Sequence, residues 1–194
     1  MTLKHVLLGA GAVALLGACA GNTADEARAA VDQTQDVGAA AAGLATAAVT
    51  TDTPGYVTNA AIGDLYEIQS SQLALQRSQS QGVRAFAQQM IADHTMTSNQ
   101  LRPLAQQAGV SVPSALDARR QEMMQNLQSA SADDFDDRYI DQQTAAHQEA
   151  LTLHRGYADR GDNAQLRTLA GQVAPRVEQH LQHIQQLDQS SADD

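Results

Sequence analysis

A seven-residue recurrence near the C-terminal end constrains the fold of this chain more than any other feature. Four residues of the recurrence are Leu166, Val173, His180 and Leu187. This spacing returns to one face of an α-helix every second turn. The neighbouring apolar residues that widen the stripe are Leu169, Ala170, Val177, Leu181 and Ile184. No alternating apolar and polar pattern competes elsewhere in the sequence, so we predict an all-α fold with the His180 imidazole in the buried seam.

Glycine, proline and capping residues divide the chain into four long helices and one short helix. The long helices are predicted over residues 55–80, 83–108, 134–160 and 163–187, with the short helix over 115–129 between the second and third. Gly109 and Gly161 are expected to end helices. Ser114 and Asp162 are the predicted N-caps of the short helix and of the last long helix. The sequence therefore predicts a four-helix bundle with a short connecting helix.

The first residues are typical of a targeting segment. An apolar run over Val6–Leu16 is too short to span a bilayer, and the following Leu16-Gly17-Ala18-Cys19 resembles the bacterial lipoprotein processing box. We predict a lipoprotein signal peptide over residues 1–18, lipidation of Cys19, and anchoring to the outer membrane facing the periplasm. The alternative is an ordinary secretory signal with an incidental cysteine. Cys19 is the only cysteine, which excludes an intrachain disulfide and a thiolate metal site.

Composition predicts the remaining domain boundaries. Residues 19–53 are rich in Ala, Gly and Thr and are expected to form a flexible tether, because few large apolar side chains are available to offset the ordering entropy. A short helix over about residues 23–33 is the alternative for its first part. The bundle domain is placed at residues 54–187, and the polar residues 188–194 are expected to be disordered. The formal net charge is −10 without a basic cluster, which argues against a nucleic-acid partner.

Four polar residues fall on the predicted inward faces of four different long helices. They are Glu67, His94, His147 and His180. Buried polar groups must be hydrogen-bonded or bound, and helix bundles commonly build metal sites from facing helices. Three imidazoles and a carboxylate suit zinc, copper, iron or manganese, with the order of affinities favouring copper or zinc. The sequence therefore predicts a divalent transition-metal site at the level of these four residues.

Each of these residues also has a simpler interpretation. A histidine on an apolar helix face is commonly a core residue with a hydroxyl or carbonyl partner, and Glu67 lies among small residues that fit a solvated, Ala-rich face. The candidates for side chains that surround the ligands are Tyr66, Tyr139, His154 and His183. The alternatives are local hydrogen-bond partners for the two tyrosines and solvent-facing positions for the two histidines, with His183 also an alternative ligand. Asp93 points about 100° away from its neighbour His94 on a helix, so we expect it to form a cap or a surface pair.

Several segments resemble the hallmarks of a known bacterial family, domain-of-unknown-function family 4142. They are Ala60-Ala61 with Glu67-Ile68, the run over 83–95 that contains Met-Ile-Ala-Asp-His-Thr, the run over 135–140, His147, and Pro175 with His180-Leu181. The resemblance covers about residues 58–187. It implies a ferritin-like four-helix bundle exported to the cell envelope, and it implies no established activity.

The ferritin-like comparison favours one metal ion over two. Di-iron bundles carry Glu-x-x-His on two helices, whereas Ile91 and Val177 stand three residues before His94 and His180. The sequence also lacks the Cys-x-x-Cys-His motif of covalent haem, a Gly-rich nucleotide loop and a hydrolase triad pattern. We predict an envelope metal-binding protein that acts in metal or oxidative stress, with no catalytic residues assigned. The alternatives are a redox enzyme with an open coordination position and a structural lipoprotein with a buried His/Glu hydrogen-bond network.

Overall fold

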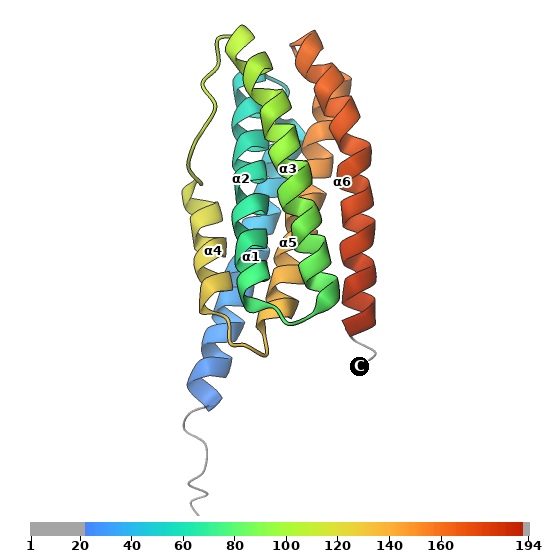
Figure 1. The fold of residues 1–194 in the computed structure, drawn as a ribbon. Helices are drawn as coiled ribbons and strands as arrows, with labels where there is room; N and C mark the ends of the chain where they lie inside the picture. Colours follow the sequence, from blue (N-terminus) through green and yellow to red (C-terminus); the bar gives the residue numbers. More distant parts are fainter. Residues whose placement is uncertain (1–21, 192–194) are drawn as a thin grey trace, which may run out of the picture.

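The computed structural model describes residues 22–191, and this part of the chain forms helices and no strands. The four long helices of the bundle are α2 (Thr53–Arg77), α3 (Gln81–Gln107), α5 (Phe135–Arg160) and α6 (Ala164–Ser191). The short helix α4 (Ala118–Ser129) packs outside α2, and an extended connection leads to it from α3 (Figure 1). The predicted all-α bundle with a connecting helix between the second and third long helices is confirmed. The predicted signal peptide and Cys19 lie outside the described residues.

Local capping chemistry sets where the helices begin and end. Asp52 accepts a hydrogen bond from the Gly55 amide at 2.8 Å, and proline occupies the first turn of α2, where its missing N–H is not needed. Ser80 caps α3 in the same way, through the amide of Val83. Gly109 follows α3 with a φ of 72°, the left-handed conformation that glycine adopts without strain.

Two predicted N-caps are wrong. Asp117 rather than Ser114 caps α4, because its carboxylate reaches the Arg120 amide at 2.7 Å. Asn163 rather than Asp162 caps α6, accepting hydrogen bonds from the amides of the second and third residues of the helix at 3.0 and 3.1 Å. Asp162 instead accepts hydrogen bonds from two hydroxyl groups on other helices. At its C-terminal end, α6 continues to Ser191. The predicted disorder of residues 188–194 is therefore wrong for residues 188–191, which are helical.

The segment predicted as a flexible tether forms a helix, α1 (Asn22–Val49), which lies against α5 and α4. Alanine is the best helix former, and it dominates this segment. The docking is largely polar: the Asp36 carboxylate accepts hydrogen bonds from Asn126, Arg138 and Gln142. The expected coil over residues 22–49 is therefore wrong. Polar contacts hold α1 on the bundle, and these contacts cannot be predicted from the small number of large apolar residues in the segment.

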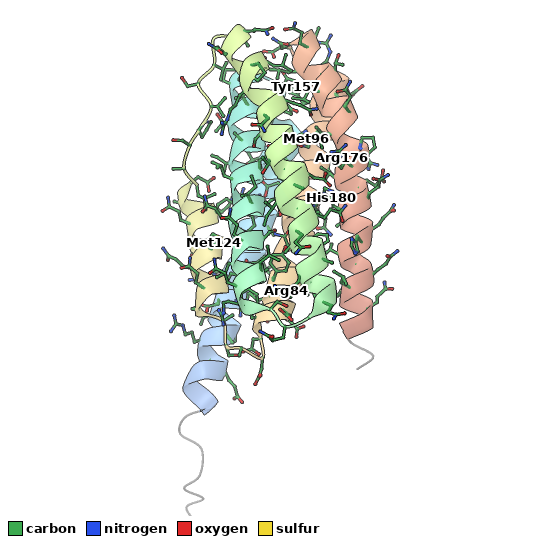
Figure 2. All side chains as sticks on the ribbon, in the orientation of Figure 1. Arg84, Met96, Met124, Tyr157, Arg176 and His180 are labelled. Carbon is green, nitrogen blue, oxygen red and sulfur yellow. The ribbon has the colours of Figure 1, made fainter. Side chains whose placement is uncertain are left out.

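A small apolar cluster includes Met123 of α4 and Ala146 of α5, and the rest of the apolar core forms two larger clusters along the length of the bundle. One contains Leu101 and Val177, and the other contains Met90 and Ile184. On α3, His94 lies between Met90 of one cluster and Leu101 of the other. On α6, His180 lies in the same way between Val177 and Ile184. The histidines therefore form a polar layer between the two apolar clusters. Figure 2 shows His180 at mid-height on α6. None of the helices within residues 22–191 has the length and apolarity needed to cross a membrane.

Candidate metal centre

Three histidine rings from three helices meet in this polar layer. His94 on α3, His147 on α5 and His180 on α6 have ring centroids 5.7, 5.7 and 5.5 Å apart. One ring nitrogen from each residue lies within 4.8 Å of the other two. All three side chains are buried, with exposed fractions of 5%, 0% and 1%. The three rings predicted as ligands are therefore brought together at one level of the bundle.

One nitrogen of each ring is fixed by a hydrogen bond at 2.8 Å. His94 Nδ1 donates to the Asp64 carboxylate on α2, and His180 Nε2 donates to the Asp93 carboxylate on α3. His147 Nδ1 donates to the backbone carbonyl of Gln143, one turn earlier on its own helix. Each partner fixes both the tautomer and the orientation of its ring.

The second nitrogen of each ring has no hydrogen-bond partner among the described residues. These atoms are Nε2 of His94, Nε2 of His147 and Nδ1 of His180. Buried polar atoms normally have a partner, so three unpartnered nitrogens in one layer need an explanation. Histidines that bind metals show this asymmetry, because one nitrogen faces the ion and the other donates to a carboxylate or carbonyl.

Glu67 lies at the edge of this group. Its side chain is buried, which rules out the solvated alternative, and its Oε2 atom has no hydrogen-bond partner within residues 22–191. Oε1 lies 3.6 Å from His147 Nδ1, beyond ordinary hydrogen-bond distance. The group of atoms within 4.8 Å of one another contains the three histidines without Glu67. Three buried histidines close together could thus hold a metal ion, while a ligand role for Glu67 stays a prediction.

A family model described as "Domain of unknown function (DUF4142)" matches residues 38–187. The chain belongs to this family. The match begins within α1, so the C-terminal part of that helix falls within the family region. The family description assigns no activity, and no curated protein matches the chain.

The DUF4142 chain is also similar to a solved structure, the crystal structure of a DUF305 fragment from Deinococcus radiodurans. The superposition has a TM-score of 0.60 and 15% sequence identity, and it covers 71% of this chain and 97% of that chain. At this identity the likeness concerns the fold alone, and it agrees with the helical bundle. The ferritin-like relationship stays a prediction.

Burial keeps two of the three rings in this DUF4142 protein neutral. Burial lowers the pKa of His147, although the nearby Glu67 opposes the shift. Burial, together with the neighbouring rings of His147 and His94, lowers the pKa of His180 to about 3. Burial acts in the same direction on His94, but the hydrogen bond and negative charge of Asp64 outweigh it and raise the pKa of His94. His147 and His180 therefore present nitrogen lone pairs at neutral pH, which metal binding requires.

The other predicted neighbours of the site hydrogen-bond elsewhere in the bundle. Tyr66 donates to Gln142 at 2.7 Å, and Tyr139 pairs with Ser71 at 2.8 Å. His154 is buried and pairs with Tyr56 at 3.1 Å. His183 is half-buried; it pairs with Gln89 at 3.3 Å, and its ring packs edge-on against Phe86. None of these hydrogen bonds reaches a ring of the three-histidine group.

Two acidic residues that position the rings were missed or misassigned from the sequence. Asp64 accepts hydrogen bonds from His94 and from Ser98, and its only sequence signal is its position three residues before Glu67 on the same helix face. Asp93 was expected at a cap or in a surface pair. It does pair with Arg176, at 3.3 Å, but its second oxygen holds His180. The 100° offset from His94 aims Asp93 at the neighbouring helix instead of at solvent.

Proposed function

We propose that this DUF4142 protein binds one transition-metal ion through His94, His147 and His180, with zinc or copper as the first candidates. A single observation carries the proposal. Each of three buried rings has one nitrogen fixed by a hydrogen bond and one without a partner, and the rings supply nitrogens within 4.8 Å of one another. Neutral imidazoles are common ligands for both metals.

A hydrogen-bond network that only stabilises the bundle fits the arrangement less well. Such a network gains stability when every buried member is satisfied, and each unsatisfied buried group costs about 1–3 kcal/mol. Here Asp64 and Asp93 satisfy one nitrogen of His94 and of His180, whereas the second nitrogen of each of the three rings has no partner within residues 22–191. An ion among the rings would satisfy all three nitrogens at once.

The donor atoms favour borderline transition metals over hard cations. Magnesium and calcium prefer oxygen ligands, whereas three imidazole nitrogens suit zinc and copper. Bonds of about 2.0–2.1 Å to zinc hold ligand nitrogens roughly 3.4 Å apart in a tetrahedral site. The candidate ligand nitrogens, one from each ring, lie within 4.8 Å of one another, so we expect them to move closer when they bind a metal ion.

Metal content after loading tests the proposal. The full-length protein is purified, incubated with zinc or copper, passed through a desalting column and analysed for metal. We expect about one ion per chain in the wild type and in His183→Ala, whose half-buried ring lies outside the three-histidine group. We expect the His147→Ala variant to lose the ion. A wild type that stays metal-free after both incubations overturns the proposal, and so does an equal loss in both variants.

We further propose that the protein acts at the cell envelope as a lipid-anchored metal-binding protein in metal or oxidative stress. The support is the lipoprotein-like motif that ends at Cys19. Metabolic labelling with palmitate tests this directly: the wild type should incorporate the label, and Cys19→Ser should not. Absence of label from the wild type contradicts the lipid anchor without affecting the metal proposal.

A further inference from the structure

A small internal cavity lies beside the three-histidine group, between α2 and α5. Its volume is about 20 Å³, and its lining includes Glu67, His94 and Arg120. The lining residues Asn59, Gly63 and Ala150 are only half-buried, so they form its mouth. A volume of about 10–15 Å³ holds one water molecule, so this cavity accommodates a single ligand of that size.

Three lining residues each carry a buried polar atom without a hydrogen-bond partner among the described residues. These atoms are Oε2 of Glu67, which is an acceptor, Nε of Arg120, which is a donor, and Nε2 of His94. The exposed fractions of these residues are 2%, 3% and 5%. A buried water needs two to four polar partners, and a cavity with an unpaired donor and an unpaired acceptor supplies them.

The remaining polar atoms of Arg120 are already occupied. Its Nη2 atom donates to Glu149 at 2.9 Å, and its Nη1 atom contacts Met123 Sδ at 3.5 Å. Glu149 is in turn held by both Arg119 and Arg120, so its charge is compensated. This pairing leaves the Nε–H group of Arg120 as the unpaired donor of the cavity wall, and Glu67 as a carboxylate with no arginine partner.

We infer that this cavity holds a water or hydroxide ligand at the open coordination position of the bound metal, hydrogen-bonded by Glu67 and Arg120. The inference rests on the proposed function, because three protein ligands leave a fourth position for solvent. His94 belongs to both the three-histidine group and the cavity lining, so the two sites adjoin. Glu67 lines the cavity but lies outside the nitrogen group, which assigns it to the solvent ligand and not to the ion.

Pulsed electron paramagnetic resonance of the copper(II)-loaded full-length protein in heavy water tests the inference. We expect nitrogen couplings from the histidines together with the coupling of an exchangeable deuteron on a copper-bound water. Histidine couplings without such a deuteron overturn the solvent ligand and leave the metal proposal intact. A wild type that binds no copper overturns the proposed function, and the inference with it.

Glu67→Gln keeps the size of the side chain and separates the two roles of Glu67. If the carboxylate holds the solvent ligand, we expect copper affinity to fall about 10- to 100-fold, as for other residues that support a ligand. One copper ion should still bind at saturating concentration, and the deuteron coupling should persist. If Glu67→Gln loses the ion as completely as His147→Ala does, Glu67 is itself the fourth ligand and the inference is wrong.

Discussion

Asp93 Oδ2 lies 2.8 Å from His180 Nε2, so a residue of α3 orients a ring of α6. Arg176, one turn before His180, holds the other carboxylate oxygen of Asp93 at 3.3 Å. Figure 2 labels Arg176 and His180 one above the other on α6, beside α3. The adjacent residue on α3, His94, supplies another ring of the same group. Two consecutive residues of α3 thus contribute one ring of the site and the support for a second ring.

Asp93→Asn should weaken metal binding without removing it. The amide cannot accept the His180 N–H with the strength of a carboxylate, so the ring loses its fixed orientation. We expect zinc affinity to fall about 10- to 100-fold in competition with a chelator. Asp159→Asn, at an exposed position on α5, is the matched control and should bind like the wild type. Equal affinity in Asp93→Asn and Asp159→Asn would show that the Asp93–His180 hydrogen bond does not support the site.

Glycine at position 43 should be required for α1 to dock. A Cβ atom there would overlap the Glu149 carboxylate and the Arg119 guanidinium, which are held together in an ion pair. We expect Gly43→Ala to lower the free energy of unfolding by about 1–3 kcal/mol.

Gly38→Ala is the control for α1, since its Cβ would meet nothing within 4 Å. It should raise stability by about 0.5–1 kcal/mol through helix propensity. Urea unfolding followed by circular dichroism measures both variants. If Gly43→Ala is as stable as Gly38→Ala, the close packing of α1 on Glu149 is not significant in solution.

His154 should make the metal-free protein less stable in acid. Burial lowers the pKa of His154 to about 3, whereas an unfolded histidine titrates near 6.5. Between these values the unfolded chain binds the extra proton. This contribution to stability is therefore complete above about pH 6.5 and is lost as the pH falls toward 3, by about 1.4 kcal/mol per pH unit.

Denaturant unfolding of the metal-free protein at pH 7.5 and pH 5.5 measures the His154 contribution. His154→Gln keeps an acceptor for the Tyr56 hydroxyl, and it should reduce the loss of stability between these two pH values by about 1 kcal/mol. His183→Gln is the matched control and should leave the loss unchanged. An identical pH dependence in wild type and His154→Gln would contradict the assignment.

Gly63→Leu should slow the exchange of metal through the cavity mouth. Gly63 lies in the half-buried rim of the cavity, and a Cβ there would meet nothing within 4 Å, so the position has open space in which a side chain can begin. We expect zinc release to an excess of chelator to be several-fold slower than in the wild type. Gly38→Leu, with equally open space on α1, is the control. Equal release rates in both variants would place the exchange route elsewhere.

The sequence predicts the three rings well because their positions follow from helical periodicity alone. His180 shares a stripe with Leu166 and Val173, so its inward orientation requires no knowledge of the partner helix. Asp93 could not be assigned in the same way. Its role depends on the rotation of α3 relative to α6, and that rotation is a property of packing between helices.

The docked α1 helix was not predicted from the sequence for a related reason. Its alanines favour a helix, but its apolar surface is too small to predict docking. The decisive contacts join Asp36 to Asn126, Arg138 and Gln142, residues that are 90 or more positions away in the sequence. Local sequence patterns cannot predict such long-range pairings, because the paired residues meet only when the bundle has formed.

X-ray absorption at the zinc edge of the loaded, full-length protein tests the central claim most directly. We expect three imidazole nitrogens and one oxygen donor at about 2.0–2.1 Å around a single zinc ion. The corresponding spectrum of His147→Ala should lose one imidazole, or the protein should lose zinc altogether. A zinc shell dominated by oxygen, with one imidazole or none, would contradict a metal centre built from His94, His147 and His180.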